Sequence, residues 1–184
     1  MEIEIYGLDN ATGLPEPADY RDYPEFWHKG QYFLGNPDSL RAKLPPYAHL
    51  IVGDVADTVS MFRDILSKES PLGFAAIDVD YYSSAVACLG ILRHDASCYL
   101  PTVPMYFDDF MQTYLTSNDW CGEALAIAEF NRDNPLRKIQ ENRLFNTMAL
   151  PGRAFHGCHV LDHPLRTNRS MHRKEFSFLA LRFV

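Results

Sequence analysis

Two apolar runs that each end in a pair of aspartates constrain this chain more than any other feature of its sequence. The first run, residues 72–80, reads LGFAAIDVD, and the second, residues 104–109, reads PMYFDD. Aspartate is a poor strand residue, and four carboxylates that lie close together repel one another unless a cation or protons intervene. We therefore take this cluster as the candidate functional site: Asp78, Asp80, Asp108 and Asp109.

The order of the apolar segments predicts an α/β fold. Strands are predicted at residues 3–8, 49–53, 73–77 and 103–107, and helices at residues 36–44, 58–67, 83–93 and 120–131. Because the strands are continuous rather than alternating apolar runs, we expect a mostly parallel sheet with flanking helices. Residues 138–145, 155–161 and 176–184 are predicted as further strands, which we expect to include an antiparallel hairpin at the C-terminal edge of the sheet.

Acidic residues follow each of the first four predicted strands. Asp9 ends the first strand and Asp54 follows the second, before the two aspartate pairs. Ligands of open parallel sheets bind at the carboxyl ends of the strands, so one edge of this sheet is predicted to carry a row of carboxylates. A single aspartate such as Asp54 is often only a turn former or a helix cap. A cap needs one aspartate, so the pairs indicate a site more strongly.

Residues 12–35 form a long predicted loop that is rich in proline, glycine and aromatic residues. A loop of this length inside a compact domain is typically a lid or a binding loop. The alternative is that its aromatic side chains only pack the loop onto the body of the protein. These aromatic residues are Tyr20, Tyr23, Phe26, Trp27, Tyr32 and Phe33.

The composition is that of one globular domain, residues 1–184. The hydrophobic content is 47% and the charged content is 22%. A net charge of −7 argues against binding to nucleic acid or to an anionic membrane, and no apolar run approaches the roughly 20 residues of a membrane span. We expect a cytoplasmic protein, because there is no secretory signal pattern and the four cysteines are scattered as reduced thiols would be.

Several segments of the chain resemble class I S-adenosylmethionine-dependent methyltransferases. The segments are YGLDNATGLPEPADYRDYPEFW, LIVGDVADT, GFAAIDVDYYSSA, YFDDF, WCGEALAIAEFN and HVLDHP, which together span most of residues 6–164. Within that class, the chain resembles the macrocin O-methyltransferase-like group, which methylates sugars. The resemblance implies a Rossmann-like fold and a methyl transfer from S-adenosylmethionine to a hydroxyl of a sugar or other small polyol.

On the donor side, the resemblance implies two contacts. Asp9 resembles the acid that holds the ribose hydroxyls of S-adenosylmethionine, and Asp54 resembles the residue beside the adenine. The first strand and the glycine-rich loop of the family, which grip the amino acid end of the donor, have no counterpart here. We therefore expect an N-terminally truncated relative, whose missing strand would leave an exposed sheet edge that favours a homo-oligomer.

On the acceptor side, the resemblance implies a metal site and a base. Asp78, Asp108 and Asp109 resemble the ligands of a divalent metal ion, usually Mg²⁺, and Asp80 resembles the general base that takes the proton from the substrate hydroxyl. A hard cation prefers carboxylate oxygens. It would lower the pKa of a bound hydroxyl and so assist a weak carboxylate base.

Other functions fit parts of the same pattern. The motif from Asp78 to Asp80 is also the DxD of glycosyltransferases that bind a metal and a nucleotide sugar, and a phosphohydrolase of the haloacid dehalogenase type ranks last because Tyr81 follows the motif. A methyltransferase-like module that has lost donor binding is the non-enzymatic alternative. Trp120 and Glu123 either line the acceptor pocket or serve core packing and helix capping.

Overall fold

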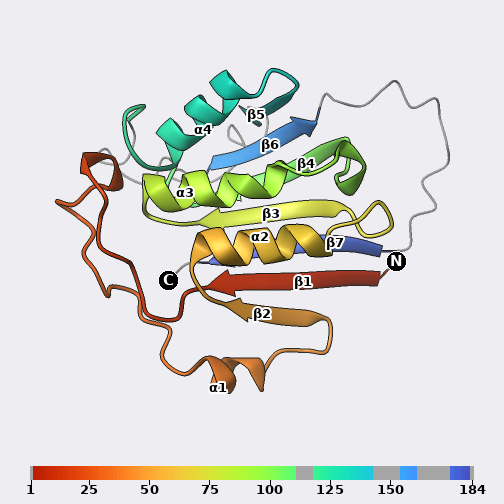
Figure 1. Cartoon of the computed structure of the whole chain (residues 1–184), viewed down its shortest axis with the longest axis horizontal. Helices are drawn as coiled ribbons and strands as arrows, with labels where there is room; N and C mark the ends of the chain where they lie inside the picture. The colour runs from red at the N-terminus through yellow and green to blue at the C-terminus, as the bar shows by residue number, and fades with distance from the viewer. Residues whose placement is uncertain (1, 111–117, 143–153, 161–174, 183–184) are drawn as a thin grey trace.

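The computed structural model describes residues 2–110, 118–142, 154–160 and 175–182, with the backbone alone for the last two ranges. The strands described form one sheet of seven in the order β2-β1-β7-β3-β4-β6-β5 (Figure 1). Their bounds are β1 Glu2–Asp9, β2 Ala48–Val52, β3 Leu72–Asp78, β4 Thr102–Phe107, β5 Arg137–Glu141, β6 Ala154–Val160 and β7 Glu175–Arg182. The mixed α/β class that the sequence predicts is confirmed.

Three helices cover one face of the sheet. They are α2 Val55–Ile65, α3 Tyr82–Cys88 and α4 Gly122–Asp133, and they lie side by side with α3 in the middle (Figure 1). Under them, side chains of β3 and β4 such as Ile77, Met105 and Phe107 are fully buried, and Phe62 of α2 packs onto the same core. The opposite face is less covered: the side chains that alternate with the buried ones are half-buried in β3, and half-buried or exposed in β4.

The helix boundaries differ from the predicted ones because local caps decide them. Asn36 caps α1 (Pro37–Arg41) by accepting from the backbone N–H groups of its first turn, and the helix ends at its C-cap Ala42, earlier than expected. Asp54 caps α2, which begins earlier than expected. After α3 the chain tightens into a 3₁₀ turn at Leu89–Leu92 instead of continuing as α-helix. No helix in the described ranges is long and apolar enough to cross a lipid bilayer.

The last strand lies in the middle of the sheet. β7 pairs in parallel with β1 on one side and with β3 on the other. The expected antiparallel pairing at the C-terminal edge of the sheet is confirmed for β5 and β6, and β6 also runs antiparallel to β4. The expectation of an exposed edge at β1 is wrong, because β1 pairs with β7 there. The argument for self-association through that edge no longer applies.

Candidate functional site

The parallel pairing of β3 and β4 brings the two aspartate pairs together. Ile77 is in register with Phe107, and the N–H of Asp108 donates to the carbonyl of Ile77 at 3.1 Å, which continues the ladder past the last strand residue. Both strands point toward the end of the molecule where the aromatic loop lies (Figure 1). The sequence prediction that the carboxylates meet at the carboxyl edge of the sheet is confirmed for these strands.

Asp80 and Asp109 form the tightest carboxylate pair. Their side chains share a hydrogen bond, and Asp80 is only 9% exposed. Burial, followed by the charge of Asp109, raises the pKa of Asp80 to about 8. Burial also raises the pKa of Asp109, while the hydrogen bond that it accepts from Asp80 opposes that shift. Burial and the mutual repulsion of the two carboxylates favour one proton shared by the pair.

The other two aspartates of the pairs belong to the less covered face of the sheet. The hydroxyl of Tyr106 donates to Oδ1 of Asp108, which places Asp108 on the Tyr106 face, and strand alternation places Asp78 there as well. Asp109 instead contacts the helix layer, because its backbone N–H donates to Glu123 of α4. No group of three carboxylate, imidazole or thiol side chains within the described ranges is arranged to hold a metal ion. The predicted metal ligands are thus near one another but do not converge.

Glu123, in the first turn of α4, is a fifth carboxyl group of the site. Its side chain is 2% exposed, and Oε2 accepts from the backbone N–H of Asp109 at 3.1 Å. Burial, then the charge of Asp109, raises its pKa well above the usual range. Oε1 is buried without a hydrogen-bond partner among the described residues. The sequence left Glu123 as either a pocket residue or a packing and capping residue, and its hydrogen bond to the N–H of Asp109 was not predictable from the sequence.

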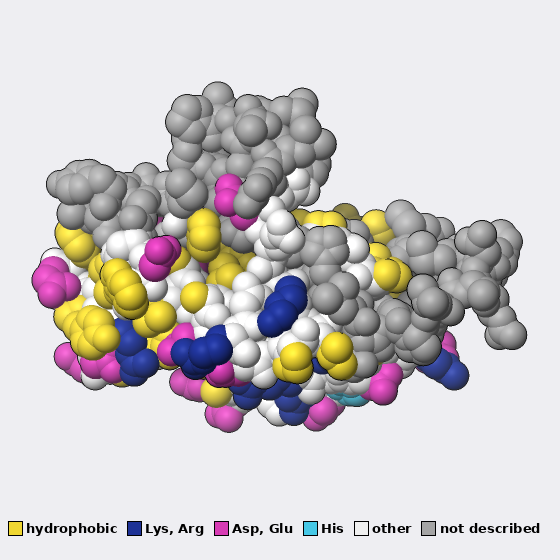
Figure 2. All heavy atoms as spheres, turned by 90° about the horizontal axis from the view of Figure 1, so that it is seen from above, with side chains coloured by type: hydrophobic (Ala, Val, Ile, Leu, Met, Phe, Trp, Pro, Cys, Tyr) yellow, Lys and Arg dark blue, Asp and Glu magenta, His cyan; other side chains and the backbone are white. Residues whose placement is uncertain are grey.

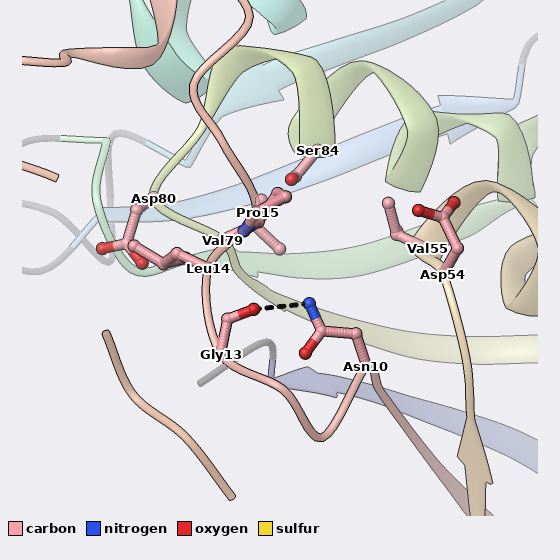
Figure 3. A pocket seen from close by; sticks show the side chains of 9 residues that line it. All are labelled: Asn10, Gly13, Leu14, Pro15, Asp54, Val55, Val79, Asp80 and Ser84. Carbon is pink, nitrogen blue, oxygen red and sulfur yellow. Dashed lines mark hydrogen bonds between the residues drawn. The ribbon is translucent and has the colours of Figure 1, made fainter. Parts of the chain in front are cut away.

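The two predicted donor contacts lie in different places. Asp54 caps α2 by accepting from the N–H of Ala56 at 2.9 Å, and it shares a small cavity of about 40 Å³ with Asp80 (Figure 3). Asp9 is buried and accepts from the N–H of Ala11. It borders a separate, mostly apolar hollow of about 510 Å³ over β1 and β2. The structure therefore does not bring Asp9 and Asp54 together around one cavity.

The start of the aromatic loop (residues 12–35) and the residues just before it form one wall of the small cavity. Figure 3 shows Asn10, Gly13, Leu14 and Pro15 crossing the space between Asp54 and Asp80. The amide of Asn10 donates to the carbonyl of Gly13 at 2.7 Å. The hydroxyl of Tyr81, which follows Asp80, donates to the carbonyl of Pro15 at 3.2 Å. The cavity has room for water but not for a nucleoside.

The rest of the loop is fastened to the helices that follow the site strands. Asp22, fully buried, accepts from the backbone N–H and the hydroxyl of Ser83 at the start of α3. The hydroxyl of Tyr23 accepts from the amide of Asn118, close to the start of α4, at 2.8 Å. Exposed hydrophobic side chains gather at the left end of the molecule in Figure 2. Tyr20 of the loop and Trp120, just before α4, are both exposed.

Tyr32 of the loop is within the electrostatic influence of the carboxylates. Burial, followed by the negative charges of Asp80, Asp109 and Asp78, raises the pKa of its hydroxyl. Its ring centroid lies 6.0 Å from that of Trp27, at an interplanar angle of 56°. The density of aromatic residues drew attention to the loop, but nothing in the sequence singles out Tyr32.

Comparison of the chain with protein-family models, with curated proteins and with solved structures finds no match in any of the three. The assignment of function therefore depends on the geometry of the site.

Proposed function

We propose that this chain is a Rossmann-like methyltransferase domain that acts on a hydroxyl of a sugar or other small polyol, with S-adenosylmethionine as the methyl donor. The observation that carries the proposal is the buried Asp80–Asp109 pair at the carboxyl ends of β3 and β4. The parallel pairing of β1, β2, β3, β4 and β7, with helices on the sheet, supports the fold part of the proposal.

Asp80 is the proposed general base. It lines the small cavity, so a hydroxyl placed there is within reach of its carboxyl group. A pKa raised to about 8 makes the deprotonated form of Asp80 a stronger base than an ordinary carboxylate. Asp109 assists because, in addition to burial, its negative charge beside Asp80 raises the pKa of Asp80. Methyl transfer itself mainly requires in-line positioning.

Mg²⁺ is part of the proposal because of the type of ligand that the site offers. Carboxylate oxygens are the ligands that this ion prefers, and the ion would offset the repulsion among Asp78, Asp108 and Asp109. In the arrangement seen, Asp78 and Asp108 lie on the opposite face of the sheet from Asp109, so binding requires a side chain to turn. We therefore assign no step of the reaction to the metal.

A second candidate function is a methyltransferase-like module that binds a ligand without transferring a methyl group. The specific observation in its favour is the volume of about 40 Å³ between Asp54 and Asp80, where the donor would lie. An adenosyl group would enter only after residues 10–15 had moved away from the edge of the sheet. Those residues are held by the Tyr81–Pro15 hydrogen bond at 3.2 Å.

Titration calorimetry separates the two candidates. The chain is titrated with S-adenosylmethionine and with a nucleotide sugar, each with and without Mg²⁺. Binding of S-adenosylmethionine alone supports the methyltransferase, and binding of neither donor supports the module. Preference for the nucleotide sugar would indicate a glycosyltransferase and contradict both.

A substitution of Asp80 tests its proposed role as the general base. Asp80→Asn is expected to lower methyl transfer at least 100-fold, with donor affinity unchanged. The matched control is Asp64→Asn, an exposed acid in the last turn of α2, at the opposite end of that helix from Asp54. Full activity in Asp80→Asn would remove Asp80 from the mechanism.

A further inference from the structure

Glu123 is a buried carboxyl group that the proposed mechanism does not use. It lies in the first turn of α4, where an acidic side chain usually serves the N–H groups of its own helix and stays exposed to solvent. Glu123 is instead 2% exposed, and its Oε2 accepts from the backbone N–H of Asp109 at 3.1 Å. Burial of a carboxyl group is costly, and Oε1 has no hydrogen-bond partner in the described ranges. This position therefore calls for an explanation.

The aromatic loop fixes the place where α4 begins. Gly122 has a φ of +56°, and a Cβ at this position would lie 2.9 Å from Cε2 of Tyr23. Tyr23 is itself buried, and its hydroxyl accepts from the amide of Asn118, four residues before Gly122. The N-cap residue, Cys121, makes no side-chain cap. The close packing of Tyr23 on Gly122 thus sets the backbone that carries Glu123.

Beyond the end of β4, the contact with Glu123 continues to hold the backbone. The ladder between β3 and β4 extends to the N–H of Asp108, which donates to the carbonyl of Ile77 at 3.1 Å. The next N–H along the chain, that of Asp109, donates to Glu123. The peptide that carries the Asp109 side chain is therefore attached to the helix layer rather than to β3. The direction of the Asp109 carboxylate then depends on where Glu123 lies.

A second hydrogen bond ties α4 to the segment that follows Asp80. The hydroxyl of Tyr82, the first residue of α3, donates to Oε2 of Glu129 at 2.6 Å. Tyr82 lies two residues after Asp80 in the chain. Helix α4 thus contacts both segments that carry the carboxylate pair, one through Glu129 and the other through Glu123. The distance between the carboxyl groups of Asp80 and Asp109 depends on how this helix docks.

We propose that Glu123 is a positioning residue, which holds the backbone of Asp109 so that the Asp109 carboxylate faces Asp80. The inference rests on the proposed function for the role of Asp80 as a general base, and it adds the residue that fixes the geometry of the pair. Catalytic groups must be held close to their productive geometry, and a hydrogen bond to a buried side chain supplies such a constraint. Glu123 does not touch the substrate in this role, so its substitution changes kcat rather than KM.

A matched set of variants tests the inference by steady-state kinetics. Glu123→Gln keeps an oxygen that accepts from the Asp109 N–H, whereas Glu123→Ala removes it. The control is Ile127→Ala, which opens a cavity one turn further along the same helix and removes no acceptor.

The three variants should differ in kcat and not in KM. We expect kcat to fall about tenfold or more in Glu123→Ala, with an unchanged KM for either substrate. In Glu123→Gln and in Ile127→Ala, kcat should stay near the parent value. A smaller fall in Glu123→Ala, or an equal fall in either of the other variants, overturns the inference.

A double substitution tests whether Glu123 acts through Asp109. Asp109→Asn removes the negative charge that Glu123 is proposed to position, but it keeps the backbone N–H. In that background, Glu123→Ala is expected to lower kcat much less than it does in the parent, because the effects of residues that act through one another are not additive. A loss of the same size in both backgrounds would show that Glu123 supports only the fold, and it overturns the inference.

Amide hydrogen exchange at Asp109 distinguishes this inference from the proposed function, because the measurement requires no reaction. We expect the Asp109 N–H to exchange about tenfold faster or more in Glu123→Ala than in the parent, in Glu123→Gln and in Ile127→Ala. Unchanged exchange in Glu123→Ala overturns the inference, even in an active methyltransferase. The expected exchange pattern in a chain that transfers no methyl group retains Glu123 as the residue that positions Asp109 and rejects the methyltransferase.

Discussion

Asp22 of the aromatic loop caps α3 from outside the helix: Oδ1 accepts from the backbone N–H of Ser83 at 2.8 Å. The second carboxylate oxygen accepts from the Ser83 hydroxyl at 3.0 Å and from the N–H of Ala18 at 2.8 Å. The residue at the N-cap position, Tyr81, offers no side-chain cap of its own. A loop residue thus completes the helix that follows Asp80, so the loop and the site are fixed to one another.

Loss of this cap should weaken the whole domain. Asp22→Ala removes three hydrogen bonds of a fully buried carboxylate, and we expect a loss of about 2–3 kcal/mol in the free energy of unfolding. Urea denaturation measures the change. Asp38→Ala, which removes an exposed ion pair with Arg41, is the control and should cost less than about 0.5 kcal/mol. Equal effects of the two substitutions would contradict the role of Asp22.

Gly13 should tolerate no side chain. Its φ is +81°, and an added Cβ would lie 2.4 Å from the carbonyl oxygen of Gln31. Gly35 has nearly the same φ, +82°, with open space around it. We expect Gly35→Ala to cost about 1 kcal/mol from backbone strain alone, and Gly13→Ala to cost at least about 2 kcal/mol more. Thermal denaturation of the pair gives the difference, and equal melting temperatures would show that the loop yields at Gly13.

Glu123 should depend more on its shape than on its charge. Glu123→Gln keeps an oxygen that accepts from the N–H of Asp109 and removes a possible charge beside Asp109. We expect a free energy of unfolding at pH 8 equal to or above that of the parent. Glu123→Ala leaves a cavity and an unpaired N–H, and it should cost about 2–4 kcal/mol. A destabilising Glu123→Gln would show that the ionised form is required.

The stability of metal-free protein should fall as the pH rises. Asp80 has a pKa of about 8 in the folded state and about 3.9 when unfolded. Between these values the folded state holds more protons than the unfolded state, so the free energy of unfolding decreases with pH. Urea denaturation in EDTA between pH 4.5 and 8.5 measures the slope. We expect a shallower slope for Asp80→Asn, and an unchanged slope would assign the effect to other groups.

The sequence predicted the parts of the fold that local patterns decide. Apolar runs located β1 to β4, and their carboxyl ends located the aspartate cluster. The apolar runs did not predict which aspartate contacts which neighbour. Strand alternation places Asp108 beside Tyr106, and the backbone N–H of Asp109 donates to Glu123. That outcome depends on the point at which each strand ends and on the docking of α4.

Non-local pairing is the part that the sequence could not supply. The residues of β7 read as a strand, but nothing in them says whether they join an edge or the centre. Asp54 is the opposite case, because a local pattern explains it fully. It caps a helix, which is the ordinary role of an aspartate after a strand, and this role requires no ligand. The row of acidic residues therefore predicted the carboxyl edge of the sheet, but it did not predict the role of each residue.

The central position of β7 has a consequence for how the protein is made. Residues 2–9 and 72–78 are synthesised long before residues 175–182, the strand that lies between them. Until β7 arrives, β1 and β3 each have an unpaired row of backbone groups, the kind of edge that recruits other chains. The long separation in sequence also slows folding. Completion of the sheet on the ribosome waits for β7, and the growing chain is most open to aggregation during that interval.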